Sequence, residues 1–243
     1  MSAEIERFFP ELDSGTITQL DELESLFREW NTRLNLVSRK DMDAFVLHHL
    51  VHSLALTKWI QFSTYGTRIL DVGTGGGLPG LPLAQCFPKA QFFLCDSITK
   101  KAKAVEDMVN SLDLKNAHVV NKRAEDLESS WDFILGRAVT VLPKFIGWIK
   151  GSIRKGGSES MPNGVLYWKG SLYKEELESL EIEPFAVYPI EDMIPDPYFS
   201  EKYIIHLSRE QVLSAKLPDP EGDQATVPGR EQKQDKTEKE HHG

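Results

Sequence analysis

The sequence predicts an α/β fold in which a helical N-terminal extension precedes a doubly wound parallel sheet. From residue 68 onward, short apolar segments alternate with helical segments, which is typical of βαβ units. Over residues 68–80 a strand-like segment also runs into a glycine cluster and then into a helix. At 243 residues and 40% hydrophobic composition, the chain can bury the core of one such domain with short extensions.

The first 64 residues are predicted to form the helical extension. Between residues 16 and 34, apolar side chains recur every three or four positions and so share one helical face; they are Leu20, Leu23, Phe27, Trp30 and Leu34. A second helix is predicted over residues 41–61, where the apolar positions surround His48, His49 and His52.

Residues 65–210 are assigned to the sheet domain. We expect strands at 68–72, 91–96, 118–121, 132–138, 164–169 and 202–207, a helix over 97–112, and an exposed loop over 151–163. The last segment, 211–243, is predicted to be a polar, disordered tail, because from residue 219 the composition is charged and poor in apolar residues.

The composition limits the cellular setting and the partners. No apolar run is long enough to cross a bilayer, and the first residues do not read as a signal peptide. The two cysteines, Cys86 and Cys95, are too few for a disulfide framework, so we expect a cytoplasmic protein with no membrane partner. The net charge of −9 argues against a nucleic-acid partner unless a local basic patch exists.

The glycine cluster is the most informative segment. It follows Asp71 and contains Gly73, Gly75, Gly76 and Gly77. Glycines let the backbone approach a ligand closely, and the following helix presents free N–H groups. A nicotinamide-binding fingerprint fits poorly because Pro79 stands at the close helix–strand approach, and a P-loop is excluded because Leu81 and Pro82 follow instead of Lys and Ser or Thr.

Asp96, at the end of the next predicted strand, can accept hydrogen bonds from both hydroxyls of a ribose, which indicates an adenosine-type cofactor. With that acidic residue, the segment Asp71–Gly77 resembles the first motif of class I S-adenosylmethionine-dependent methyltransferases, which implies their Rossmann-like fold and S-adenosylmethionine as cofactor.

The resemblance extends to one family, the ribosomal RNA small subunit methyltransferases G. It is carried by segments between about residues 20 and 207, which are 35–38, 49–54, 71–82, 96–97, 123–125, 137–138 and 169–170. The family methylates N7 of a guanine in the 530 loop (helix 18) of 16S ribosomal RNA. This implies that the partner is 16S RNA or the small ribosomal subunit, and we expect a monomer.

The resemblance also implies site residues. Gly73 and Leu78 line the cofactor loop together with the neighbouring Gly75 and Gly77, while Ala124 and Glu125 lie beside the adenine. Arg137 lies at the cofactor and target pocket, where it either orients the guanine or pairs with Glu125 or Asp71 to hold the pocket. Candidate RNA contacts are Arg39, Lys40, Lys169 and Lys202, the last at a position where the family often has arginine.

No general base is expected, because N7 of guanine offers a lone pair and has no proton to remove. Cys86 and Cys95 are interpreted as small core residues. His48 and His52 share a helical face as two zinc ligands would, but a third ligand is missing, so no metal is predicted. Two alternatives stay open: a class I methyltransferase acting on a protein or small molecule, and a cofactor-binding RNA module without turnover.

Overall fold

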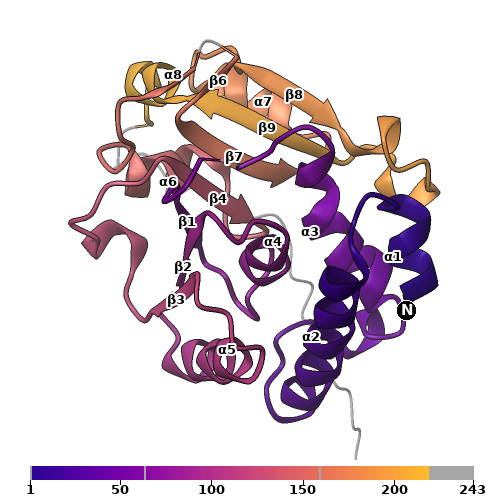
Figure 1. Cartoon of the computed structure of the whole chain (residues 1–243). Coiled ribbons are helices and arrows are strands. Elements are labelled where there is room, and N and C mark those ends of the chain that lie inside the picture. The colour runs from indigo at the N-terminus through magenta and orange to yellow at the C-terminus, as the bar shows by residue number, and fades with distance from the viewer. Residues whose placement is uncertain (1, 63, 159, 219–243) are drawn as a thin grey trace, which may run out of the picture.

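A seven-stranded sheet runs through the part of the chain that the computed structural model describes, residues 2–62, 64–158 and 160–218 (Figure 1). Its strand order is β3-β2-β1-β4-β7-β9-β8. The first five of these strands are parallel to one another. Strand β9 pairs antiparallel with β7 on one side and with β8 on the other. The bounds are β1 (Arg68–Val72), β2 (Gln91–Cys95), β3 (Ala117–Val120), β4 (Phe133–Arg137), β7 (Gly164–Lys169), β8 (Ala186–Pro189) and β9 (Tyr203–Ser208). The chain order reverses between β1 and β4, where doubly wound sheets bind their ligands.

Two hydrophobic layers cover the sheet, because alternate strand residues point to opposite faces. Ile69 and Phe92 belong to one core with the N-terminal helices, α4 (Gly80–Cys86) and α5 (Thr99–Ser111). Leu70 and Ile134 belong to the other core. That second layer consists of α6 (Leu142–Ile149), α7 (Tyr173–Ser179) and α8 (Arg209–Ser214).

The N-terminal extension packs directly on the sheet domain. It begins with α1 (Ser2–Phe8) and α2 (Ser14–Arg33), and the side chain of Asp13 caps α2 by accepting the N–H of Thr16 at 3.0 Å. Leu20 and Phe27, on the apolar face of α2, are fully buried in the same core as the sheet residues, and Trp30 packs against this core partly buried. The extension and the sheet therefore share one hydrophobic core.

The second predicted helix, residues 41–61, is not one regular helix. A 3₁₀ turn, η1 (Arg39–Asp41), is followed by a π-helical turn, η2 (Val46–Val51), then by α3 (His52–Leu54) and a 3₁₀ turn, η3 (Ala55–Lys58). Apolar spacing cannot distinguish these turn types, since all of them keep one side buried. The π-helical turn is notable because such turns occur often at functional sites.

Three further predictions need correction. The segment 151–163 is not only a loop: Ile153 is buried and bridges to Trp131, and β5 (Gly157–Ser158) pairs with β6 (Met161–Pro162). Strand β8 was not predicted at all. The folded region also extends past residue 210, because α8 is closed by a capping box at Ser208 and buries Val212. Residues 219–243 lie outside the described part of the chain.

The remaining short elements are the 3₁₀ turns η4 (Ala124–Asp126), η5 (Ile190–Asp192) and η6 (Pro197–Phe199). Among the described residues, no helix combines the length and the apolar character needed to span a membrane.

Candidate active site

The glycine turn that joins β1 to α4 lies at the carboxyl edge of the sheet. Gly73, Gly75 and Gly77 have φ angles of +66°, +59° and +89°, in the left-handed region that favours glycine. A side chain at Gly75 would meet no atom closer than 3.9 Å, so its position opens onto empty space. A Cβ at Gly76 would instead lie 2.4 Å from the ring of Phe27. The turn is therefore closed on its Gly76 side and open on its Gly75 side.

Asp71 ties the turn to the start of α4. Its Oδ2 atom accepts hydrogen bonds from Thr74 Oγ1 at 2.7 Å and from the Gly80 N–H at 2.9 Å. Its Oδ1 atom is buried without a hydrogen-bond partner among the described residues. Burial raises the pKa of this carboxyl to about 6, although the bond from Thr74 acts in the opposite direction.

Asp96 holds the other side of the turn. Its Oδ2 accepts the N–H of Gly75 at 3.0 Å, and its Oδ1 accepts the N–H of Ile98 at 2.8 Å. The carboxylate thus links the glycine turn to the start of α5. Beside it lies a cavity of about 110 Å³, here called the β2 cavity, which Asp96, Ala124 and Glu125 help to line. Ala124 is buried and Glu125 is exposed at its edge.

A larger cavity of about 310 Å³, the turn cavity, lies between the glycine turn and the π-helical turn η2. Gly73 lines both the β2 cavity and the turn cavity, so the two adjoin at the glycine turn. The other residues that line the turn cavity include Gly75, Leu78, His49, His52, Arg137 and Tyr198. Gly77 does not line the turn cavity. It faces the side chain of Leu81 instead, since a Cβ at Gly77 would lie 2.3 Å from that side chain.

Arg137 projects from the end of β4. Its Nη1 donates to the backbone carbonyl of His49 at 3.3 Å, and its Nη2 lies 3.5 Å from Nδ1 of the same histidine. Among the described residues it makes no ion pair with Glu125 or Asp71, the two partners weighed from the sequence. Burial lowers the pKa of Arg137 to about 10, which leaves the guanidinium charged at neutral pH.

The carbonyls of η2 and α3 anchor the site to the sheet domain. Three side chains from beyond residue 136 donate to them. The segment that contains His48, His49 and His52, here called the histidine segment, is therefore held in place through its backbone. The donors are Arg137 to His49, the Tyr198 hydroxyl to His48 at 3.4 Å, and Trp168 Nε1 to His52 at 2.9 Å.

The histidine rings have separate environments. His48 Nδ1 donates to Asp41 Oδ1 at 3.0 Å, and this bond lowers the pKa of the Asp41 carboxyl. Burial, together with the Arg137 charge, lowers the pKa of His49 to about 4 and that of His52 well below its usual value. In the described residues, no group of three or more His, Cys, Asp or Glu side chains is placed to hold a metal ion.

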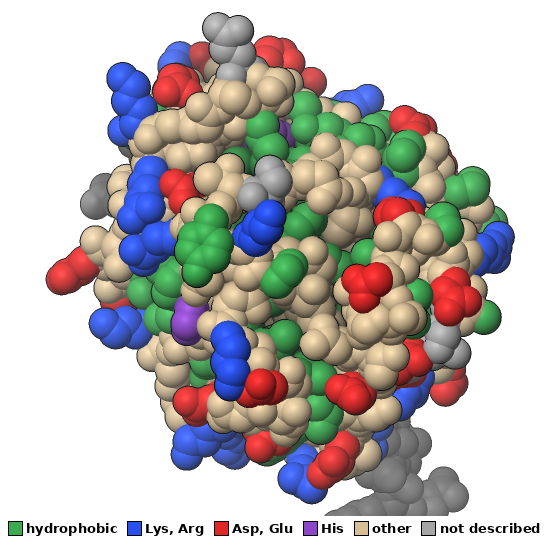
Figure 2. All heavy atoms as spheres, viewed as in Figure 1, with side chains coloured by type: hydrophobic (Ala, Val, Ile, Leu, Met, Phe, Trp, Pro, Cys, Tyr) green, Lys and Arg blue, Asp and Glu red, His purple; other side chains and the backbone are tan. Residues whose placement is uncertain are grey.

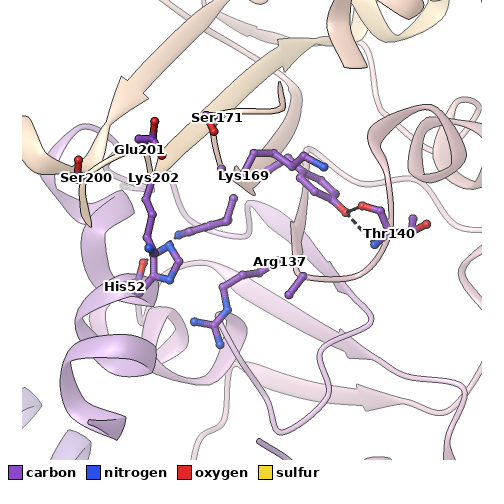
Figure 3. A pocket seen from close by; sticks show the side chains of 12 residues that line it. His52, Arg137, Thr140, Lys169, Ser171, Ser200, Glu201 and Lys202 are labelled. Carbon is purple, nitrogen blue, oxygen red and sulfur yellow. Dashed lines mark hydrogen bonds between the residues drawn. The ribbon is translucent and has the colours of Figure 1, made fainter. Parts of the chain in front are cut away.

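A third cavity, of about 430 Å³, adjoins the turn cavity and is called the basic cavity after Arg137, Lys169 and Lys202, which help to line it (Figure 3). Lys202 Nζ lies 4.0 Å from the ring centroid of Tyr198, whose ring stacks on His48 at 3.8 Å. Lys169 pairs with Glu176 at 2.6 Å.

The other basic candidates lie outside these cavities. Arg39 and Lys40 are exposed on η1 and line none of the three cavities described here. On the face seen in Figure 2, Lys and Arg side chains alternate with Asp and Glu, so no single basic field covers that face.

Several site residues carry no local sequence signal. Tyr198 on η6, Trp168 on β7 and Trp148 on α6 line these cavities because the fold brings these separate elements together. Asp41 lies seven residues before His48, about two helical turns, so a contact between the two side chains could have been predicted from the sequence. The cysteines are not placed for nucleophilic chemistry: burial raises the pKa of both Cys86 and Cys95 to about 12.

Comparison with known proteins adds the following. A family model described as rRNA small subunit methyltransferase G (GidB) matches residues 16–197. A protein named ribosomal RNA small subunit methyltransferase G from Flavobacterium johnsoniae is 42% identical over 204 residues, which cover 84% of this chain and 96% of that protein. The protein of the same name from Bacteroides thetaiotaomicron is 37% identical, over 82% of this chain and 96% of its own length.

Among solved structures, a SAM dependent methyltransferase from Aquifex aeolicus aligns with a TM-score of 0.50 and 15% identity, covering 75% of this chain and 96% of that one. At that identity, the likeness is one of fold.

Proposed function

The chain belongs to the ribosomal RNA small subunit methyltransferase G family, and from this premise we propose that it methylates N7 of a guanine in the 530 loop (helix 18) of 16S ribosomal RNA. The methyl donor is S-adenosylmethionine. The partner is 16S RNA or the small ribosomal subunit, met in the cytoplasm, and the protein acts as a monomer. One observation carries the proposal: the turn cavity and the basic cavity meet at Arg137, where a cofactor on the glycine turn would face an anionic substrate.

The residues present suit S-adenosylmethionine. The open position at Gly75 leaves room that any side chain would fill, and the β2 cavity offers the Asp96 carboxylate to a ribose. Each Asp96 oxygen accepts one backbone N–H and keeps a lone pair for a further donor. We assign the methionine part to Gly73, Gly75 and Leu78 and the adenosine part to Asp96, Ala124 and Glu125; Gly77 acts by shaping the turn.

When bound, S-adenosylmethionine supplies an electrophilic methyl group on its sulfonium. The guanine N7 lone pair needs no proton removed, so the work of this chain is to bind, orient and exclude water. Arg137 is the main orienting residue in this proposal, because it is charged, half-buried and common to the turn cavity and the basic cavity.

Lys202 is the strongest of the proposed RNA contacts, since its ammonium group lies in the basic cavity without an acidic partner among the described residues. Lys169 contributes less charge because Glu176 neutralises it. Arg39 and Lys40 are proposed to contact phosphates at the rim, where both are exposed.

The test is to incubate the full chain with tritiated S-adenosylmethionine and, separately, small ribosomal subunits, free 16S RNA and a cell extract depleted of RNA. Label in 16S RNA that digests to 7-methylguanosine is the expected result. Label only in the RNA-depleted extract would favour a protein or small-molecule substrate. Cofactor and RNA binding with no label anywhere would favour an RNA module without turnover, and either result would contradict the proposal.

A further inference from the structure

Two side chains with opposite hydrogen-bonding character mark the place where the turn cavity and the basic cavity meet. His52, Arg137 and Ala138 are the residues that line both cavities. Figure 3 shows Arg137 and Lys202 pointing into the cavity beside the His52 ring. A base entering through the basic cavity toward the glycine turn must pass against these groups.

His52 presents a hydrogen-bond acceptor at this junction. Its Nε2 atom is buried and has no hydrogen-bond partner among the described residues. The backbone of His48 acts on the His52 ring in the sense that raises its pKa, as an acceptor does. We therefore assign the ring proton to Nδ1, on the side of the His48 carbonyl, which leaves the lone pair on Nε2.

The ring is held in place and stays neutral. Trp168 anchors the His52 carbonyl at 2.9 Å, and the rings of Tyr198 and Phe199 lie edge-on to the imidazole at 6.1 and 5.7 Å. Burial and the positive charges of Arg137 and Lys202 lower its pKa well below the usual value. His52 is therefore an acceptor at every pH where the reaction would run.

Arg137 is the complementary group, because a guanidinium can only donate. Its two contacts with His49, at 3.3 and 3.5 Å, are long and leave donors free. The junction thus offers one donor beside one acceptor. Guanine presents the matching pair on neighbouring atoms, with O6 as acceptor and N1–H as donor, whereas adenine presents the reverse, an N6 amino group and an unprotonated N1.

We propose that His52 determines the base specificity of the reaction, with Nε2 accepting the N1–H of the target guanine while Arg137 donates to O6. This rests on the proposed function. The assignment gives His52 Nε2 a hydrogen-bond partner in the complex. Without a ligand, a buried nitrogen that lacks a partner lowers the stability of the folded protein. Lys202 lines the basic cavity beside the His52 ring, so an entering base would pass its side chain.

The experiment compares His52→Leu, which keeps the volume and removes the acceptor, with His52→Gln, which keeps an acceptor at similar reach. His118→Ala is the control, because His118 is exposed on β3, far from His52 in sequence, and its ring hydrogen-bonds to Gln91. Each protein is tested by single-turnover methylation of 16S RNA that carries guanine, inosine or 2-aminopurine at the target position. Inosine keeps O6 and N1–H; 2-aminopurine lacks both.

We expect His52→Leu to lower methylation of the guanine and inosine RNAs about ten- to hundredfold and to leave the 2-aminopurine RNA within about threefold of its rate with the parent. His52→Gln should recover much of the loss, and His118→Ala should match the parent. Affinities of the three RNAs for protein saturated with S-adenosylhomocysteine give the same comparison where turnover of 2-aminopurine RNA is too slow to follow.

The inference is overturned if His52→Leu methylates guanine RNA as fast as the parent does, or if it lowers the methylation rates of all three RNAs by the same factor. The second result would mean that His52 only positions Lys202, and Lys202→Met would then reproduce it. If the parent protein methylates no form of 16S RNA, the proposed function itself fails. That outcome is distinct from a parent that is active and variants that do not discriminate.

Discussion

The carboxylate of Asp96, just after β2, accepts at 3.0 Å the backbone N–H of Gly75 in the turn that follows the neighbouring strand β1. The acidic residue assigned to the cofactor ribose therefore also fixes the turn that would receive the rest of the cofactor. Binding affinity and stability of the turn are coupled through one side chain.

Replacing Asp96 should separate these two roles. Asp96→Ala leaves the Gly75 N–H unpaired, so we expect a loss of about 1–3 kcal/mol in the free energy of unfolding and at least tenfold weaker S-adenosylmethionine binding. Asp96→Asn keeps one acceptor oxygen, which can serve Gly75 or Ile98 but not both, so it should lose affinity with a smaller loss of stability than Asp96→Ala. Titration calorimetry and thermal unfolding measure both quantities. Unaltered cofactor affinity in Asp96→Ala would show that the ribose binds elsewhere.

The open and closed sides of the glycine turn predict different effects for the same substitution. Gly75→Ala should weaken cofactor binding while costing only about 1 kcal/mol of stability, because its Cβ meets no atom but must adopt a φ of +59°. Gly76→Ala should lower the unfolding free energy by about 1–3 kcal/mol, because its Cβ would overlap Phe27. Equal melting temperatures for the two variants would contradict this assignment.

Arg137→Ala should lower methylation of RNA far more than it lowers cofactor affinity, because it removes an interaction with the base in the transition state. Arg137→Lys should restore little, since an ammonium group cannot reproduce the planar donor fork. Single-turnover rates and cofactor dissociation constants are measured for both variants. A parallel fall in the two quantities would instead indicate that Arg137 supports the cofactor site through its contact with the η2 turn.

His206 should make the stability depend on pH. It is fully buried on β9, and burial lowers its pKa from 6.5 to about 4. Between these values the unfolded chain binds a proton that the folded chain does not, so the unfolding free energy falls as the pH is lowered from 6.5 to 4. The lowered pKa of His49 has the same effect. The raised pKa of Asp71 has the opposite effect, because it makes the unfolding free energy rise as the pH is lowered.

The contribution of His206 is isolated by comparing the parent with His206→Leu in urea at pH 7 and pH 5, because the other groups are common to both proteins. The parent should lose about 2 kcal/mol more than the variant over this range. Identical losses would show that His206 is accessible to protons in the folded state.

Much of the fold could be predicted because buried parallel strands read as uninterrupted apolar runs. Strands β1 and β7 begin and end at the predicted residues. Strand β8 gave no such signal, since all of its residues are half-buried at the sheet edge and it includes Pro189. The π-helical turn was also unpredictable, because the burial pattern of a helix does not report which carbonyl each N–H reaches.

The site was predictable only as far as it is local in sequence. The glycine turn and Asp96 follow from two strand ends and could be assigned. The partner of Arg137 could not, because the His49 carbonyl is 88 residues away and reaches it through packing of the extension on the sheet. The specificity assigned to His52 depends on a tautomer that only this packing defines.

The anchoring of the histidine segment by Arg137, Trp168 and Tyr198 has a consequence for the order of biosynthesis. The segment is synthesised before all three donors, and its carbonyls acquire their last donor only when residue 198 has been added. A nascent chain that already contains the glycine turn and the first four strands of the sheet still lacks one wall of the basic cavity. Under the proposed function, the site that would bind RNA is therefore completed late in synthesis, after the first strands of the sheet that supports it.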